Sequence, residues 1–485
     1  MILHNIFLPV IIATSLLFAA AVVFFEHKNP ATSLTWVLVL LFLPVIGIIA
    51  YLFLGTGFKI NKKKRYKLKA INDRLYNKYI LKHLNIADSF KFMAAHSGVA
   101  RLVTYLNNGC GGVYTQGNSA RVFTSGADFY PRLMDDLAAA RSHIHMLFFI
   151  FRADGIGRRM AAILEEKARQ GVEVRFIYDS LGSRVVGTPP IFQNMRAAGA
   201  RVLGFSPVFS NLGSHLRLNY RNHRKITVID GQIGYIGGMN IGDEYLGQDK
   251  KLRPWRDTHL RLTGPAVWFL QERFLMDWAY TSDLERPGDD QVGQYFPEPL
   301  GQGRLGTQII SSGPDTSDDC RLKSGLIAQI SAAQKNVFIQ TPYFAPDESF
   351  MDALRIAAQS GVDARLMIPG LGDHWIAQMA TLGYAREAVK FGLRVFLYQG
   401  FIHSKTVVSD SLVTSIGTTN LTNRSFVLDF EANAFIYDRD FGRENERIFL
   451  EDQSNCLEIN LAWFEMKGRA SRAAYNFARL FAPLM

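Results

Sequence analysis

Residues 222–240, "NHRKITVIDGQIGYIGGMN", bring several chemically active side chains together at a fixed spacing. His223, Lys225 and Asp230 form the pattern H-x-K-x-x-x-x-D, and Asn240 follows ten residues later. Side chains two residues apart on a strand share a face, so His223 and Lys225 are predicted to point the same way. One copy of this pattern is weak evidence, because surface strands carry such residues by accident.

The same pattern returns in residues 402–420, "IHSKTVVSDSLVTSIGTTN". Each member lies 180 residues after its counterpart, as His403, Lys405, Asp410 and Asn420. Seven positions are identical in a window of 18 residues. Two copies inside two repeats are a strong signal, and a pseudo-twofold pairing of the repeats would turn both copies toward one pocket.

The side chains of such a pocket suit the non-bridging oxygens of a phosphate diester. The ammonium groups of Lys225 and Lys405 act as point charges, and the amides of Asn240 and Asn420 add donors. Fixed donors of this kind also stabilise the charge of a phosphoryl-transfer transition state without a metal ion.

Two histidines can divide the chemistry, because imidazole, with an ordinary pKa of about 6.5, serves both as a nucleophile and as an acid or base. One histidine would attack phosphorus and form a phosphohistidine. The other, protonated, would donate its proton to the leaving alkoxide and then deprotonate the incoming alcohol.

Each histidine needs an acidic partner on its second ring nitrogen, which fixes the tautomer and the orientation of the ring. Asp257 in "WRDTHLRL" and Glu431 in "LDFEANAF" lie on alternating strands shortly after a motif, and they are the candidates. Asp230 and Asp410 belong to the two motifs, but they end their strands, and we interpret them as residues that close the turn.

The remaining histidines and the cysteines show no metal-binding spacing. The 11 histidines include no H-E-x-x-H pair and no Cys/His cluster. Cys110, Cys320 and Cys456 are odd in number and far apart, which favours a reducing compartment. We therefore expect no metal ion and no other cofactor.

Two repeats must position these side chains. Residues 139–150, "AARSHIHMLFFI", correspond to residues 332–343, and residues 170–183 correspond to residues 360–373. Each half reads as a helix ending in Ala-Ala, an apolar strand, a second helix, a glycine and another apolar strand. This alternation predicts an α/β fold. A linker rich in Gly, Pro and Asp, at 286–303, divides a first half, 111–285, from a second half, 304–460.

The N-terminal residues 1–58 predict a transmembrane helical hairpin. No residue is charged from 5 to 25 or from 34 to 54, and about 20 apolar residues cross a bilayer. Seven basic residues follow between positions 59 and 69, at the start of a basic segment and linker, 59–110. By the positive-inside rule this side is cytoplasmic, so we expect a multi-pass inner-membrane protein with its catalytic body in the cytoplasm.

A formal net charge of +11 indicates an anionic partner, and composition alone leaves nucleic acid, acidic lipid and a phosphate-bearing substrate open. The hairpin favours anionic membrane lipid and argues against nucleic acid. The last segment, 461–485, reads as an amphipathic helix up to Pro483, with aromatic residues interleaved with Lys and Arg. This helix either packs on the body or lies in the membrane interface.

At the two motifs the sequence resembles the phospholipase D superfamily, whose signature is two H-K-D motifs, each followed by G-x-x-N. Residues 222–245, the hairpin and the C-terminal "RLFAPLM" are similar to bacterial cardiolipin synthases in particular. The second motif ends G-T-T-N where many relatives have G-S-x-N, and Thr418 keeps the hydroxyl group.

The resemblance implies a pseudo-dimer of two phospholipase D-like α/β halves that share one active site. It implies that two phosphatidylglycerols give cardiolipin and glycerol through a phosphatidyl-enzyme intermediate, without a metal. By the usual order of the family, His223 is the nucleophile and His403 the acid and base. His215 and Arg217, just before the first motif, are secondary candidates for contact with a lipid headgroup.

Other functions stay open at this point. A nuclease of the same superfamily would use the same site, but the hairpin argues against it. A phosphatidylserine synthase or a hydrolytic phospholipase D would share the chemistry. A non-enzymatic membrane scaffold would not need two complete motifs. The residues alone do not identify the acceptor alcohol.

Because the lysines supply the charge that a metal ion would, catalysis should persist in a chelator. We expect purified protein to retain its full rate in EDTA, measured as product formed per minute. Complete loss of activity in EDTA, with recovery on adding one divalent ion, would contradict the metal-free site.

Overall fold

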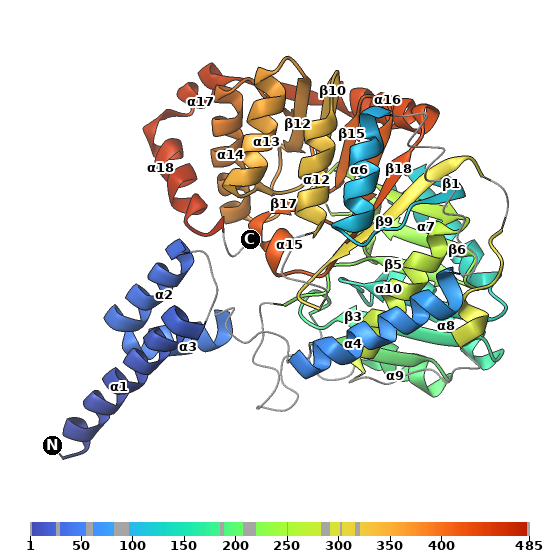
Figure 1. Cartoon of the computed structure of the whole chain (residues 1–485), viewed down its shortest axis with the longest axis horizontal. Coiled ribbons are helices and arrows are strands. Elements are labelled where there is room, and N and C mark those ends of the chain that lie inside the picture. The colour runs from blue at the N-terminus through green and yellow to red at the C-terminus, as the bar shows by residue number, and fades with distance from the viewer. Residues whose placement is uncertain are drawn as a thin grey trace.

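The computed structural model describes residues 2–25, 30–54, 62–81, 97–184, 189–206, 220–249, 251–282, 292–300, 303–315 and 321–482. These residues form a group of N-terminal helices and a body of two α/β halves (Figure 1). His215, Arg217, Cys320 and Pro483 lie outside the described residues, as do residues 286–291 and 301–302 of the expected linker 286–303.

The N-terminal helices are α1 (Ile2–Phe25), α2 (Pro30–Phe42) and α3 (Pro44–Leu54). Val22, Leu40 and Tyr51 pack together where the three helices meet. The expected continuous helix over 34–54 is wrong, because the chain bends at Leu43, just before Pro44, whose ring cannot continue a regular helix. None of the helices in the described residues has both the length and the apolar character to cross a membrane.

The basic segment after these helices contributes to both halves. Helix α4 (Lys62–Leu75) and the π-helical turn η1 (Tyr76–Ile80) bury Leu68, Leu75 and Ile80 in the core beside α10 (Ala266–Thr281). Helix α6 (Ser97–Asn108) packs instead on α12 (Arg321–Ala332) of the second half. The segment 59–110 is therefore not a simple linker, since each of its helices completes a different core.

A single 15-stranded sheet runs through both halves, which meet where β1 and β9 pair antiparallel. The first half has the spatial order β1 (Thr115–Phe123), β8 (His259–Thr263), β6 (Ile233–Gly237), β5 (Ile226–Ile229), β2 (His143–Phe148), β3 (Glu173–Asp179) and β4 (Arg201–Phe205). The second half has the spatial order β9 (Leu305–Ser312), β18 (Glu431–Tyr437), β16 (Val413–Gly417), β15 (Thr406–Ser409), β10 (Asn336–Gln340), β12 (Asp363–Pro369), β13 (Arg394–Tyr398) and β19 (Cys456–Ile459). Leaving β19 aside, the two orders match strand by strand outward from the junction, which confirms the repeat.

Helices cover the sheet. The first half carries α7 (Gly126–Ala138), α8 (Gly155–Arg169), α9 (Pro190–Ala197) and α10. The second half carries α12, α13 (Glu348–Gln359), α14 (Trp375–Lys390), α15 (Asn423–Val427) and α16 (Arg439–Gln453). Several of these helices begin at a side chain that accepts a hydrogen bond from the first turn, as predicted for capping residues; examples are Ser125, Asp154, Asp347 and Asp438.

The strand directions place both motif histidines at the edge of the sheet where the parallel strands end. β5 runs antiparallel to β2, with Ile226 opposite Leu147, and β15 runs antiparallel to β10, with Thr406 opposite Gln340. Residues just before β5 and β15 therefore lie where β2 and β10 end. In α/β sheets this carboxyl edge of the parallel strands is where ligands bind.

The C-terminal segment forms two helices rather than the single helix expected. α17 (Leu461–Met466) and α18 (Gly468–Arg479) are separated at Gly468, whose φ of 78° does not continue a helix. α18 packs on α14, where Arg479 pairs with Glu387. Phe477 on the same helix is 53% exposed and Leu480, directly after it, is 75% exposed, so this segment has one face on the body and one face free of it.

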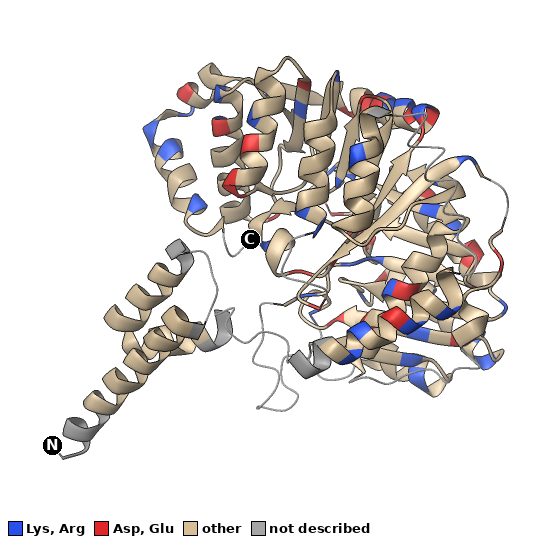
Figure 2. Ribbon diagram, in the orientation of Figure 1, with Lys and Arg blue, Asp and Glu red and all other residues tan. Residues whose placement is uncertain are grey.

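Charge is distributed unevenly over the molecule (Figure 2). The described parts of α1, α2 and α3 carry no Lys, Arg, Asp or Glu, whereas the helices of the body carry both signs. The charged and uncharged regions meet between α3 and α4. The N-terminal helices therefore differ in charge from the α/β body.

Candidate active site

Each motif histidine hydrogen-bonds to a carboxylate from the other half. His223 Nδ1 lies 2.9 and 3.1 Å from the two oxygens of Glu431, and His403 Nδ1 lies 2.6 Å from Asp257 Oδ2. A carboxylate accepts, so each Nδ1 carries the proton and each Nε2 of a neutral ring keeps its lone pair. The sequence did not indicate which acid pairs with which histidine. In the structure, both pairs join the two halves.

The main chain of each motif histidine also hydrogen-bonds to the other half. His223 N donates to Phe430 O over 3.0 Å, and His403 N donates to Arg256 O over 2.6 Å. The second contact continues a short parallel ladder between β7 (Trp255–Arg256) and β14 (Phe401–Ile402). The residue before each acid thus holds the backbone of the opposite histidine, and the geometry of each pair does not depend on side chains alone.

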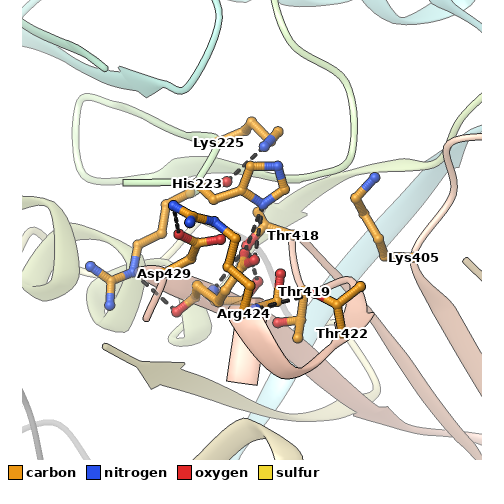
Figure 3. Close-up of polar contacts among 12 residues, drawn as sticks. His223, Lys225, Lys405, Thr418, Thr419, Thr422, Arg424 and Asp429 are labelled. Atoms are coloured by element: carbon orange, nitrogen blue, oxygen red, sulfur yellow. Dashed lines mark hydrogen bonds and ion pairs between the residues drawn. The ribbon is translucent and has the colours of Figure 1, made fainter. Parts of the chain in front are cut away.

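Figure 3 shows Lys225 and Lys405 in the region of His223. Lys225 Nζ donates to His223 O over 2.7 Å, and Lys405 Nζ donates to His403 O over 2.6 Å. Burial lowers the pKa of Lys225 to about 7 and that of Lys405 to about 8. An anion placed between them would restore the charged forms, so these two groups are suited to receive a phosphate.

The two histidines differ electrostatically. Burial, followed by the charges of Lys225 and Lys405, holds the pKa of His223 well below its ordinary value. Burial and then Lys405 also lower the pKa of His403, but there Asp257 opposes the shift. His223 is therefore held neutral, as a nucleophile must be, and His403 is the ring better placed to accept a proton.

The carboxylates that pair with the two histidines also differ in pKa. Burial raises the pKa of Glu431 to about 7. Burial also acts to raise the pKa of Asp257, but the charge and hydrogen bond of His403 lower it overall. Asp257 is thus the stronger anion, and it faces the histidine that would carry a proton during the reaction.

The two motif asparagines are not equivalent. Asn240 accepts from Ile150 N over 3.0 Å and donates to Tyr245 Oη over 2.8 Å, so its amide is used within the first half. Asn420 is 8% exposed, and its Oδ1 has no hydrogen-bond partner among the described residues. The Asn420 amide is therefore less engaged by its own half than the Asn240 amide is.

The motif aspartates stand apart from the histidines, at the opposite ends of β5 and β15. Asp230 accepts from the backbone N–H groups of residues 141, 142 and 143 over 2.7–2.9 Å. Asp410 accepts from those of residues 334, 335 and 336 over 2.7–3.0 Å. These contacts hold the start of β2 and of β10, which agrees with the interpretation of both aspartates as structural residues.

Several supporting residues were not predicted. Thr418 donates its hydroxyl hydrogen to Glu431, and Arg224 donates to Glu431 O over 3.1 Å while pairing with Asp277 over 2.5 Å. Arg424 pairs with Asp429 over 3.1 Å close to the first dyad (Figure 3). The position of Thr418 within the G-T-T-N sequence is the one available signal, because the arginines stand in no repeated pattern.

Metal ligands do not gather at the site. In the ranges that the structure describes, no group of three or more His, Cys, Asp or Glu side chains is arranged to hold a metal ion. The expectation of a cofactor-free reaction stays a prediction.

Comparisons with known proteins agree with this geometry. The family described as "Cardiolipin synthase, PLD-like domain" matches residues 133–252 and 326–453, one stretch in each half. The family "Phospholipase_D-nuclease N-terminal" matches residues 15–55. A crystal structure of phosphatidylserine synthase from Haemophilus influenzae has a TM-score of 0.59 at 16% identity, covering 79% of this chain and 97% of that one, which shows a shared fold.

Curated relatives match along the full length. A cardiolipin synthase from Listeria monocytogenes is 39% identical over 482 residues, covering 99% of this chain and 98% of its own. One from Clostridium perfringens is 37% identical over 469 residues, covering 95% of each chain. The doubled fold and the two motifs define an enzyme of the phospholipase D superfamily. Within that superfamily, the chain belongs to the cardiolipin synthase family.

Replacing Asp410 tests whether the motif aspartates are structural. Asp410→Ala removes the acceptor of three backbone N–H groups, which should lower the free energy of unfolding by about 2–4 kcal/mol. Asp410→Asn keeps one acceptor oxygen and tolerates the φ of 54°, so its loss should be smaller. Denaturant unfolding measures both. A stable Asp410→Ala protein with abolished turnover would instead give the carboxylate a chemical role.

The lysine pKa values predict a pH dependence. Lys225 and Lys405 are charged below pH values near 7 and 8 in the empty site, so positive charge is lost as the pH rises through this window. KM for an anionic substrate should therefore rise above about pH 8, whereas kcat should hold to higher pH because bound phosphate keeps the lysines charged.

Lys405→Arg should move the rise in KM to higher pH, because a guanidinium stays charged throughout. Initial rates from pH 6 to 10 measure it, and Lys335→Arg, at an exposed lysine, is the matched control. A KM that stays constant to pH 10 in the unmodified enzyme would show that these lysines do not supply the binding charge.

Proposed function

We propose that the protein is a membrane phosphatidyltransferase that makes cardiolipin and glycerol from two molecules of phosphatidylglycerol. The observation that carries this proposal is the pair of histidine–carboxylate dyads built across the two halves, each beside a buried lysine. Full-length relatives that bear the name cardiolipin synthase support the choice of lipid.

In the first half-reaction, His223 Nε2 attacks phosphorus of one phosphatidylglycerol. The bond from phosphorus to the glycerol headgroup oxygen breaks, and that oxygen takes a proton from His403. A phosphatidyl group on His223 and free glycerol result. The ring of His223 becomes positively charged, and Glu431, hydrogen-bonded to Nδ1, supplies the balancing negative charge.

In the second half-reaction, His403 takes the proton from a headgroup hydroxyl of the second phosphatidylglycerol. That oxygen attacks phosphorus, the phosphorus–nitrogen bond breaks, and cardiolipin leaves with His223 neutral again. Lys225, Lys405 and the amide of Asn420 would hold the non-bridging oxygens in both steps. Asp257 keeps the His403 ring oriented while its protonation state alternates.

The N-terminal region supports a membrane location for this chemistry. We propose that α1, α2 and α3 form the anchoring hairpin, since their described residues carry no charged side chain and residues 15–55 match an N-terminal family of phospholipase D proteins. The basic helix α4 would then face anionic lipid on the cytoplasmic side, with the body beside it.

The C-terminal helix α18 supplies a second membrane contact in this proposal. Phe477 is exposed on it and Leu480 is exposed directly after it, and Arg469 and Arg472 lie on the same helix. Apolar and basic side chains together suit the boundary between acyl chains and anionic headgroups. Such a contact would bring diacyl substrates to the pocket without drawing their chains through water.

Incubating the purified protein with phosphatidylglycerol alone, labelled in its headgroup glycerol, tests the reaction. Cardiolipin and labelled glycerol should form in equal amounts. His223→Ala should lower the rate at least 100-fold, since the nucleophile is lost, whereas His374→Ala, at an exposed histidine, should change little. Acid-quenched enzyme should carry the phosphatidyl group on His223.

Other products would identify the alternatives. Phosphatidic acid in place of cardiolipin would indicate a hydrolytic phospholipase D, and a lipid product that appears only with added serine would indicate a phosphatidylserine synthase. An adduct that survives His223→Ala and is lost in His403→Ala would reverse the roles of the two histidines. If the protein turned over no lipid, the result would support the alternative of a non-enzymatic membrane scaffold.

A further inference from the structure

A second cavity lies away from the two histidines, between helix α4 and the body. It has a volume of about 700 Å³ and is lined by α4, α10, β9 and the first residue of α12. Neither motif contributes a side chain to it. Figure 1 shows α4 lying across the first half near α10, so the cavity lies beneath the helix that follows the N-terminal region.

Cations line one part of this cavity. Arg321 opens α12, and its Nε is buried without a hydrogen-bond partner among the described residues. Gly111 makes room for the guanidinium, since a Cβ there would lie 3.1 Å from Arg321 Nη1. Lys69 on α4 lines the same cavity. An anion could accept hydrogen bonds from both of these side chains.

Acceptors and further unpaired atoms line another part. Arg273 and Asp315 are each 7% exposed and pair with each other over 2.8 Å. Arg273 Nε and Asp315 Oδ1 nevertheless lack partners among the described residues. Buried polar atoms are rarely left unpaired, so this part of the cavity could both donate hydrogen bonds to a ligand and accept hydrogen bonds from it. Leu68 and Phe269 add an apolar wall.

An ion-pair chain joins this cavity to the active site. Arg273 contacts Asp277 over 3.1 Å, and Asp277 contacts Arg224 over 2.5 Å. Arg224 directly follows His223 in the chain and donates to Glu431 O. A change in the charge around Arg273 therefore reaches the His223–Glu431 dyad through buried contacts, where electrostatic interactions are strong.

We propose that this cavity is a second ligand site, which binds a glycerol-phosphate group and thereby stabilises the ion-pair chain behind the first dyad. The phosphate oxygens would accept from Arg321 and Lys69, and the glycerol hydroxyls would donate to Asp315. Both a phosphatidylglycerol headgroup and free glycerol phosphate carry this chemistry. The proposal does not depend on which lipid the enzyme makes, because its test measures binding.

Binding should be measured on the full-length protein with Lys225→Gln and Lys405→Gln, which weaken anion binding at the active site. Labelled glycerol 1-phosphate should still bind at one equivalent per chain. Adding Arg321→Gln should weaken this binding at least tenfold, and Arg321→Lys should retain most of it. Arg355→Gln, at an exposed arginine outside the cavity, is the matched control.

If the double variant does not fold, stoichiometry on the unmodified protein replaces it, with two equivalents expected and one after Arg321→Gln. Binding of dihexanoyl phosphatidylglycerol should be measured in parallel on His223→Ala, which cannot turn this lipid over. If the lipid binds more tightly than glycerol 1-phosphate, the site takes a lipid headgroup. If the lipid binds more weakly, the site takes free glycerol phosphate. The proposed site would be refuted if no second equivalent of glycerol 1-phosphate bound, or if Arg321→Gln left the binding unchanged.

The link to the active site has a separate readout. With saturating substrate, Arg321→Gln should lower turnover threefold or more, and Arg321→Lys should restore it. Unchanged turnover together with lost binding would refute the coupling. Lost lipid turnover in the unmodified enzyme would refute the proposed function while the binding result stood.

Discussion

The exchange of histidine partners between the halves is the constraint on which the active site depends. His223 and Glu431 are 208 residues apart, and His403 and Asp257 are 146 residues apart. Neither motif histidine takes its carboxylate from its own half. An isolated half would therefore present an unpaired acid and an unoriented ring, and the catalytic geometry exists only when the two repeats are docked.

Buried arginines fix this docking behind both dyads. Arg224 reaches from the first motif to Glu431 O and is neutralised by Asp277. Arg256, next to Asp257, contacts Ser404 beside the second histidine and pairs with Asp452. Removing one member of a buried ion pair leaves an uncompensated charge that costs about 3–5 kcal/mol. The Arg256–Asp452 pair crosses between the halves. Arg224 crosses through its hydrogen bonds to Glu431 O and Ser312 O, whereas its partner Asp277 belongs to its own half.

Much of the fold was predictable because it is periodic: the repeats, the helix–strand alternation and the two motifs recur at fixed intervals. The pairing of His223 with Glu431 was not, because sequence spacing carries no information on which half supplies a distant contact. The different surroundings of Asn240 and Asn420 were likewise hidden, since identical motifs give no sign of their neighbours. The break at Gly468 was missed because amphipathic spacing continues across it, although the glycine itself could have indicated a stop.

The two dyads are alike in topology but differ in chemistry, and the residues beside the two acids differ as well. Gly238 and Thr418 hold equivalent places in the motifs, yet a Cβ at Gly238 would overlap the carboxylate of Asp257. Position 238 therefore supplies no hydroxyl donor to Asp257, whereas Thr418, at the equivalent position, donates to Glu431. Donation from Thr418 lowers the pKa of Glu431, but burial outweighs it and leaves that pKa raised to about 7, whereas the charge and hydrogen bond of His403 lower the pKa of Asp257. In the proposed mechanism, the stronger anion therefore faces the histidine that transfers protons, and the acid of raised pKa faces the histidine that attacks phosphorus.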